Sequence, residues 1–210
     1  MSKQDVARAL IQRHGTTYAK QAGMRLKDAP APLYQLLVLS VLLSARISAD
    51  VATAAARELF QAGYRNPRAM RDATWQQRVD ALGRGHYRRY DERTSTMLGD
   101  GAELVLERWN GDLRRLHGDA RSTRELEQLL QQVPGLGPAG AAIFCREVQD
   151  VWSDVAPYVD DKVAQGAKRV GLPATPDRLA SYAPKGQFAP LAAACVRAAL
   201  SKQVAADVTE

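Results

Sequence analysis

Two short segments of the chain carry residue types that could bind or act on a charged ligand. The first is residues 133–141, with the sequence VPGLGPAGA, and the second is residues 158–160, with the sequence YVD. In the first segment the glycines permit tight backbone turns, and Pro138 suits the first position of a helix. We therefore expect residues 133–141 to join two helices through a tight hairpin.

A hairpin of this kind can bind phosphate. Its glycines carry no side chain that would hold a nucleic-acid strand away, and the free amides of the following helix lie at the positive end of the helix dipole. Such contacts hold a sugar-phosphate backbone without reading its base sequence. A Pro-Gly-x-Gly turn is equally a plain connection between antiparallel helices, so the turn alone leaves both interpretations open.

Asp160 could serve as both a helix cap and a chemical group. At the start of a helix beginning near Asp161, its side chain would accept backbone hydrogen bonds. Those donors and the helix dipole favour a negative carboxylate, which suits a group that stabilises positive charge developing on a sugar. Lys162 is an amine two residues further on, although a solvent-facing lysine in a first helical turn explains it as well.

The elements that must position these segments are helices. Helical periodicity covers almost every segment, and no run alternates as a half-buried strand would, so the sequence predicts an all-α fold. Residues 33–43 are nearly continuously apolar and should form a central buried helix, whereas residues 204–210 are expected to be a frayed end. The expected helices are 3–13, 33–44, 49–61, 75–82, 90–109, 123–132, 138–148, 162–170, 176–182 and 187–199.

Composition narrows the class of protein. The chain has 210 residues and a formal net charge of +6, which permits nucleic-acid binding without requiring it. Its N-terminus lacks the apolar core of a signal peptide, and the longest apolar run, residues 36–43, is too short to span a membrane. Cys145 and Cys195 are too few for a zinc or iron–sulfur site. We expect a soluble cytoplasmic protein.

Residues 64–93 hold eight arginines against four acidic residues. Arginine pairs with phosphate, and aromatic rings stack on bases, so aromatic residues among these arginines favour a surface that binds a polyanion. A solvated arginine-rich surface is the alternative. The interleaved ring-bearing residues are Trp75, His86, Tyr87 and Tyr90.

Three motifs occur in the order seen in one known superfamily: LLSA at 42–45, VPGLG at 133–137 and VD at 159–160. Over roughly residues 30–172 the chain resembles the endonuclease III-like helix-hairpin-helix DNA glycosylases. The resemblance implies one glycosylase unit over residues 1–210, with two helical lobes flanking a DNA-binding cleft. One lobe would comprise residues 30–140, and the other residues 1–29 plus 141–210. A base must leave the duplex stack before its glycosidic bond can be reached.

The resemblance also implies residue roles. Asp160 would be catalytic, and Arg46 would fill the gap left by an extruded base, unless it is simply an exposed arginine at a helix end. DNA contacts would come from Gly135, Leu136, Gly137, Ala139, Gly140, Arg84 and Arg88. The base pocket would draw on Tyr34, His86, Tyr87 and Tyr158, with Leu37 and Trp152 as further candidates, although aromatic residues at such positions also occur in cores.

The sequence departs from the family pattern in two ways. Ala139 stands where bifunctional members carry the lysine that attacks the sugar. The cysteine cluster that binds an iron–sulfur centre in many relatives is missing, so we expect no cofactor. The family further implies a monovalent cation at hairpin carbonyls such as those of Val133 and Gly135, with no metal bound by side chains.

These observations lead to three hypotheses. The first is a monofunctional DNA glycosylase that acts as a monomer on double-stranded DNA, associated with the nucleoid when bound and with no membrane contact. The second is a DNA-binding sensor of the same fold without catalysis, favoured by the missing lysine and opposed by Asp160. The third is a helical interaction scaffold in which the 133–137 turn is only a connector.

Overall fold

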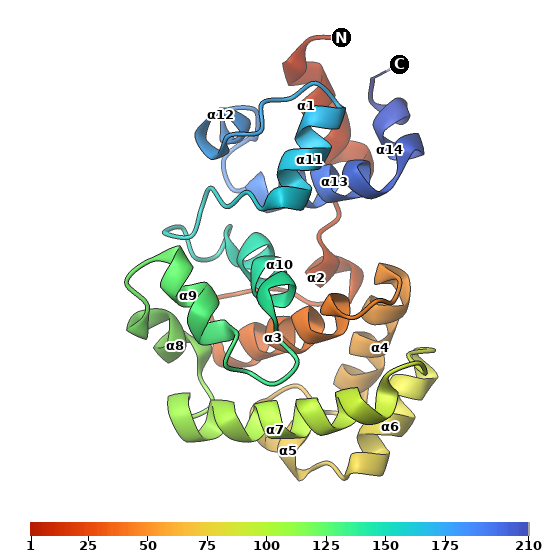
Figure 1. Ribbon diagram of the computed structural model, residues 1–210, viewed down its shortest axis with the longest axis vertical. Helices are drawn as coiled ribbons and strands as arrows, with labels where there is room; N and C mark the ends of the chain where they lie inside the picture. The colour runs from red at the N-terminus through yellow and green to blue at the C-terminus, as the bar shows by residue number, and fades with distance from the viewer. Residues whose placement is uncertain (210) are drawn as a thin grey trace. The chain divides into compact units, whose positions relative to one another are not determined.

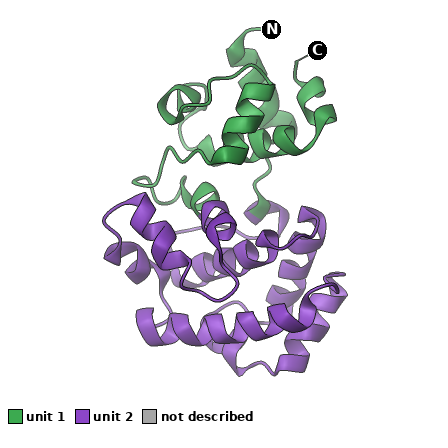
Figure 2. Cartoon of the chain, in the orientation of Figure 1, with its two compact units in different colours: residues 1–18, 145–210 green, residues 19–144 purple. Residues whose placement is uncertain are grey.

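The computed structural model describes residues 1–209, and within them every regular element is a helix. The all-α prediction is therefore confirmed (Figure 1). The chain forms two compact units, shown in separate colours in Figure 2. Unit 1 comprises Met1–Tyr18 and the chain from Cys145 onward, and unit 2 comprises Ala19–Phe144. None of the described helices has the length and apolar character needed to cross a membrane.

Unit 2 is built around one apolar helix. As predicted, α3 is buried on most sides, and Leu33, Leu36, Leu39 and Leu42 have no exposed surface. It packs against α4 and α8, while α7 packs against α5, α6 and α8. The elements are α2 (Tyr18–Gln21, at the unit boundary), α3 (Pro30–Ser44), α4 (Ala49–Gln61), α5 (Pro67–Asp72), α6 (Trp75–Arg84), α7 (Asp91–Trp109), α8 (Leu113–Asp119), α9 (Thr123–Leu130) and the start of α10 (Pro138–Val148).

Unit 1 centres on α13, which packs against α1, α11 and α14. The closest approach is at Gly166 of α11, where an added Cβ would lie 1.7 Å from the carbonyl oxygen of Cys195 in α13. Only glycine therefore allows these two backbones to pack at this distance. The elements are α1 (Lys3–His14), the end of α10, α11 (Asp161–Arg169), α12 (Pro176–Ala180), α13 (Phe188–Leu200) and α14 (Lys202–Asp207).

The end of the chain is more ordered than the sequence predicted. Residues 202–207 form α14, which Ser201 caps by accepting the Val204 amide. Ala205 and Val208 are buried, and the Asp207 carboxylate contacts His14 Nε2 at 2.8 Å. For residues 204–208 the expectation of a frayed end was wrong, because these tertiary contacts hold a helix too short to show apolar periodicity. Glu210 lies outside the described residues.

The short helices α2, α5 and α8 were likewise not predicted. Residues 19–29, which the sequence assigned to the same lobe as the N-terminus, belong to unit 2. Ala22 and Met24 are buried there, and Gln21 Nε2 donates to Asp50 Oδ1 at 2.7 Å, which fastens this segment to α4. Isolated apolar residues such as these give no periodic signal, so only the tertiary contacts reveal the boundary.

Candidate nucleic-acid interface and fixed carboxylate

The predicted hairpin is present between α9 and α10. Its turn packs against α3 on one side and α7 on the other. Gly135 has a left-handed backbone, with φ of +85°, and an added Cβ would lie 3.1 Å from both Met97 Sδ and Val41 Cγ1. The Ser44 hydroxyl lies 2.7 Å from the Val41 carbonyl oxygen and 3.2 Å from the Gly135 carbonyl oxygen, so its one proton is shared between these two acceptors. Ser44 belongs to the LLSA motif, so the structure joins two of the three motifs at one contact.

Gly137 differs from Gly135, because nothing inside the protein requires glycine there. It is exposed, its φ lies outside the left-handed region, and an added Cβ would have no heavy atom within 4 Å. By contrast, a Cβ at Gly140 would lie 2.7 Å from Leu136 Cδ1, so that glycine serves internal packing. The missing side chain at position 137 leaves room for something outside the chain.

The start of α10 presents a bare, uncharged surface. The Ala141 amide donates to the Gly137 carbonyl at 3.0 Å, so the amides of Ala139 and Gly140 precede the first helical hydrogen bond. Gly137, Pro138 and Ala139 are all exposed. This end of α10 can therefore offer backbone N–H groups to an anion without a side chain in the way.

The two hairpin carbonyls predicted to hold a cation each have a protein donor within reach. The Val133 carbonyl accepts the Leu136 amide at 3.0 Å, and the Gly135 carbonyl lies against the Ser44 hydroxyl. Each carbonyl oxygen keeps a second lone pair, so a cation at these carbonyls stays a prediction. Among residues 1–209, no group of three or more His, Cys, Asp or Glu side chains could hold a metal ion.

Asp160 is held rigidly within unit 1. It is the N-cap of α11, where Oδ1 accepts the Val163 amide at 2.8 Å, as the sequence predicted. Its second oxygen, Oδ2, lies 2.5 Å from Nη1 of Arg146, with side-chain exposures of 12% for Asp160 and 5% for Arg146. Each carboxylate oxygen thus has one protein donor and retains further lone pairs for another ligand.

Arg146 is the functional-site residue that sequence reasoning missed. It lies near the end of α10 together with Glu147 and Gln149, and all three are buried. Two polar residues at the end of an otherwise apolar helix, with a third directly after it, are a signal that could have revealed this cluster, since buried polar side chains require partners. Arg146 Nε has no hydrogen-bond partner among the described atoms, so this buried guanidinium is not fully satisfied.

Gln149 positions the backbone that leads to Asp160. Its Oε1 accepts the Tyr158 amide at 2.7 Å, and its Nε2 donates to the Arg146 carbonyl at 2.9 Å. Gln149 is only 1% exposed, so it has little freedom to move. The segment before α11 and the end of α10 are therefore joined through both Gln149 and the Arg146–Asp160 ion pair.

Two positions were considered for an amine that could perform lyase chemistry. One of them carries no amine, and the other carries a lysine that faces solvent. Ala139 is exposed at the second position of α10 and carries no nucleophile. Lys162 is exposed on α11, where its Nζ lies 3.3 Å from Gln165 Oε1. This is the ordinary environment of a surface lysine and agrees with the solvent-facing interpretation.

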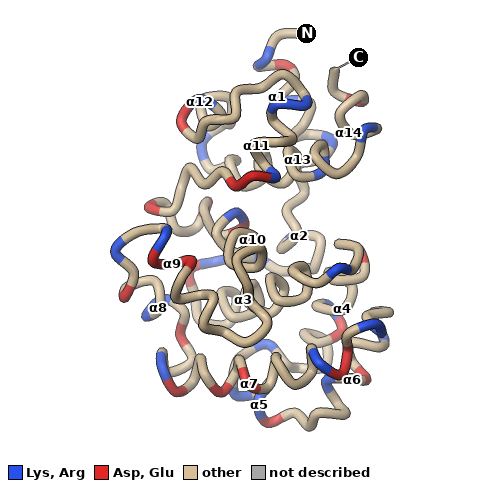
Figure 3. Tube along the Cα trace, in the orientation of Figure 1, with Lys and Arg blue, Asp and Glu red and all other residues tan. Residues whose placement is uncertain are grey.

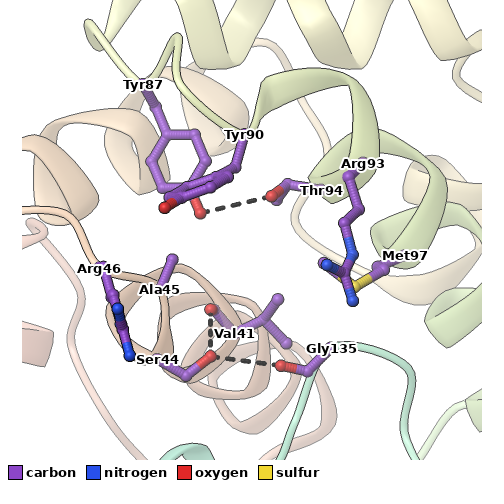
Figure 4. Close-up of a pocket in the computed structure, with 10 residues that line it drawn as sticks. All are labelled: Val41, Ser44, Ala45, Arg46, Tyr87, Tyr90, Arg93, Thr94, Met97 and Gly135. Atoms are coloured by element: carbon purple, nitrogen blue, oxygen red, sulfur yellow. Dashed lines mark hydrogen bonds between the residues drawn. The ribbon is translucent and has the colours of Figure 1, made fainter.

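Of the residues predicted for a base pocket, Tyr87 is the one that lines the cavity of unit 2. Tyr34, Leu37 and Trp152 are buried core residues, and His86 is exposed with φ of +63°. Tyr158 belongs to unit 1, whereas Tyr87 and Arg46 line a cavity inside unit 2 (Figure 4). The sequence alone could not distinguish the core residues from the cavity-lining residues, because aromatic side chains occur in both environments.

The arginines of residues 64–93 do not all face solvent without a partner. Arg78 is buried and donates to the carbonyls of Met70, Ala73 and Ser95. Arg84 is exposed but pairs with Glu58 at 3.1 Å. Basic and acidic positions are interleaved along α6 and α7 (Figure 3). The exposed arginines for whose side chains no hydrogen bond or ion pair is found in the described part of the chain are Arg68, Arg88, Arg89 and Arg93.

Comparison with known proteins supports the fold. No protein-family model matches the sequence, and no curated protein sequence is significantly similar to it. Two solved structures match over 93% of this chain and 85% of theirs. One is a trapped covalent intermediate of endonuclease III with DNA, an estranged-adenine complex (TM-score 0.51, 18% identity), and the other a non-covalent endonuclease III–DNA complex (0.53, 17%). The chain shares the all-helical fold of endonuclease III.

Proposed function

We propose that this protein binds double-stranded DNA and hydrolyses the N-glycosidic bond of a damaged or mispaired base. The observation that carries the proposal is the combination of an exposed glycine hairpin with a fixed carboxylate in the fold of endonuclease III, which has been solved in complex with DNA. Such a reaction leaves an abasic site and requires no redox cofactor. We expect the protein to act as a monomer.

DNA binding is supported by the hairpin. A phosphate placed against the start of α10 would meet the amides of Ala139 and Gly140 at the positive end of the helix dipole. Exposed Gly137 lets the strand approach closely, and the packing of Gly135 against Met97 and Val41 fixes the turn. Arg88, which is exposed and has no carboxylate partner among residues 1–209, adds affinity that weakens with salt.

Asp160 is proposed as the group that assists bond cleavage. The bond between C1′ and the base nitrogen breaks, and the base leaves with the electron pair. The sugar then carries positive charge, which a nearby carboxylate stabilises. Water adds to C1′ and gives up its proton to Asp160 or to solvent. Gln149 and Arg146 act as positioning residues, since each holds Asp160 or its backbone and neither needs to touch the reacting atoms.

A monofunctional mechanism follows from the residues at the start of α10. A lyase step needs an amine that attacks C1′ to form a Schiff base, and Ala139 cannot supply one. Lys162 would have to leave solvent and its contact with Gln165 to take this role. We therefore propose that the product is an intact abasic strand.

A DNA-binding sensor without catalysis is the second candidate, and the Arg146–Asp160 ion pair favours it. A guanidinium 2.5 Å from Oδ2 offsets much of the negative charge that a developing sugar cation would need. In a sensor the pair would simply join α10 to α11. An assay of base release separates the two candidates.

The test uses duplexes carrying uracil, an oxidised pyrimidine, an alkylated purine, 8-oxoguanine or an adenine mispair. The proposal predicts strand breaks that appear only after alkaline treatment and no adduct trapped by borohydride. Breaks without alkali, with a trapped adduct, would overturn the monofunctional assignment. Duplexes that are bound but remain intact would favour the sensor, and the absence of salt-sensitive binding would favour a scaffold.

A further inference from the structure

The side chain of Met97, on α7, packs against the turn of the hairpin. A Cβ added at Gly135 would lie 3.1 Å from Met97 Sδ and 3.3 Å from Met97 Cε, so the thioether borders the space in which a side chain at position 135 would lie. Val41 of α3 borders the same space, with Cγ1 at 3.1 Å. A change in the size or polarity of the Met97 thioether would therefore act directly on the hairpin.

Met97 is accessible to small molecules from solvent. It is partly exposed, and it lines a cavity of about 330 Å³ in unit 2 (Figure 4). Arg46 and Arg93, which are exposed, also line this cavity, so it opens to solvent. A volume of about 15 Å³ is enough to hold a water molecule, so a small oxidant such as hydrogen peroxide can enter the cavity.

Most other sulfur atoms of the chain are shielded from such an oxidant. The chain has four methionines and two cysteines, and Met24, Met70, Cys145 and Cys195 are all buried. Burial also raises the pKa of the Cys195 thiol to about 12, so little of the reactive thiolate is present. Met1 is 71% exposed, but it belongs to unit 1, whereas the hairpin turn belongs to unit 2. An oxidant in solution therefore reaches one sulfur atom that packs against the hairpin.

We propose that Met97 is a site of reversible oxidation that weakens the binding of DNA by the hairpin. A lone pair of the sulfur attacks one oxygen of hydrogen peroxide, and the O–O bond breaks. The departing hydroxide takes the proton of the transferred oxygen and leaves as water. The thioether is oxidised by two electrons to a sulfoxide, and the peroxide is reduced. The proposal rests on the DNA-binding part of the proposed function and does not depend on catalysis by Asp160.

The sulfoxide would not fit the contact that the thioether makes. Its oxygen is polar and enlarges a group that packs against Val41 and Gly135. Arg93 lies one helical turn before Met97, lines the same cavity and has no carboxylate partner within residues 1–209, so its guanidinium is a suitable donor to this oxygen. A side chain that turns towards Arg93 leaves Gly135, and the hairpin then loses part of its packing.

The test measures the Kd of the protein for a DNA duplex before and after treatment with hydrogen peroxide, while peptide mass spectrometry follows the gain of one oxygen at each methionine. The Kd of the wild type should rise at least about fivefold, because a misfit in a packed site costs free energy of this order. Hydrogen exchange at the hairpin amides should become faster. Incubation with the two methionine sulfoxide reductases, one for each sulfoxide epimer, should restore the original Kd.

Each variant is compared with itself before treatment. Met97→Leu keeps the approximate volume of the contact but carries no sulfur, so peroxide should change its Kd by less than about twofold. Met70→Leu is the matched control, because Met70 is fully buried, and it should respond to peroxide as the wild type does. Met1 is present in both variants and in the wild type, so its oxidation would not explain a difference between them.

Three results would overturn the proposal and leave DNA binding intact. The first is an unmodified Met97 under conditions that convert free methionine to the sulfoxide. The second is an oxidised Met97 with an unchanged Kd, and the third is an equal loss of affinity in Met97→Leu. Failure of the untreated wild type to bind any duplex would instead overturn the proposed function, and this proposal with it.

Discussion

The two hairpin glycines should respond differently to substitution, although they are only two positions apart. Gly135→Ala places a Cβ on a backbone with φ of +85°, which costs about 1–2 kcal/mol for an L-residue. The same Cβ would lie 3.1 Å from Met97 Sδ and Val41 Cγ1, so these neighbours must also shift. We expect a loss of about 2–3 kcal/mol in the free energy of unfolding.

Gly137→Ala meets no such obstacle, because its Cβ would point into open space. The expected loss is below about 1 kcal/mol, the cost of alanine in place of glycine at a helix cap. For a chain of this size, each kcal/mol shifts Tm by about 2–4 °C, so thermal unfolding should separate the two variants clearly.

DNA affinity provides the second half of the test. Gly137→Asn introduces a side chain that is suited to a helix cap but fills the space in which a phosphate would lie. Its Kd for a duplex should rise at least about tenfold, or 1.4 kcal/mol, with little change in Tm. An unchanged Kd in Gly137→Asn would refute the claim that this turn contacts DNA. Equal destabilisation of the two alanine variants would refute the claim that internal packing requires glycine at position 135 and not at position 137.

The remaining predictions concern the packing of each unit. Gly166→Ala should destabilise unit 1 by at least about 3 kcal/mol in denaturant unfolding, because the new Cβ would overlap the Cys195 carbonyl; a loss below 1 kcal/mol would contradict the close packing of α11 and α13. Arg78→Met should cost unit 2 at least about 3 kcal/mol, since it strands three buried carbonyls, and an unchanged Tm would argue against this role. Burial raises the pKa of the Cys195 thiol to about 12, so an aromatic disulfide reagent should label it at pH 8 only after denaturant is added; rapid labelling of the native protein would contradict its burial.

Local patterns predicted the parts of the structure that depend on neighbouring residues. The continuous apolar run at 33–43 located α3, and Asp160 was identified as a helix cap from the residues that follow it. The hairpin was predicted from its glycines and Pro138. Each of these features is determined within a few positions along the chain, so a single sequence reveals it.

Long-range contacts account for what the sequence did not predict. Arg146 and Asp160 are fourteen positions apart, and their ion pair depends on how α10 leads into α11. Arg78 was counted with the basic surface, yet it satisfies carbonyls in the interior of unit 2. Charge alone does not distinguish an arginine that faces solvent from one that holds helices together, because both are polar residues in amphipathic segments.

The Arg146–Asp160 pair also dictates how Asp160 must be tested. Asp160→Asn alone leaves the Arg146 guanidinium buried without its counter-charge, which costs about 3–5 kcal/mol in comparable sites. The double variant Asp160→Asn with Arg146→Met removes both charges and keeps an N-cap side chain. If the double variant still folds and binds DNA, a loss of activity can therefore be attributed to the missing carboxylate and not to misfolding.

The most direct test of the central claim is the single-turnover rate of base release from the best substrate duplex. We expect the double variant to bind this duplex within about threefold of wild type and to release the base at least about a thousandfold more slowly, as for loss of a group that stabilises a transition state. Release at an equal rate would show that Asp160 does not carry the chemistry. The absence of release by the wild-type protein, despite tight duplex binding, would contradict the glycosylase assignment.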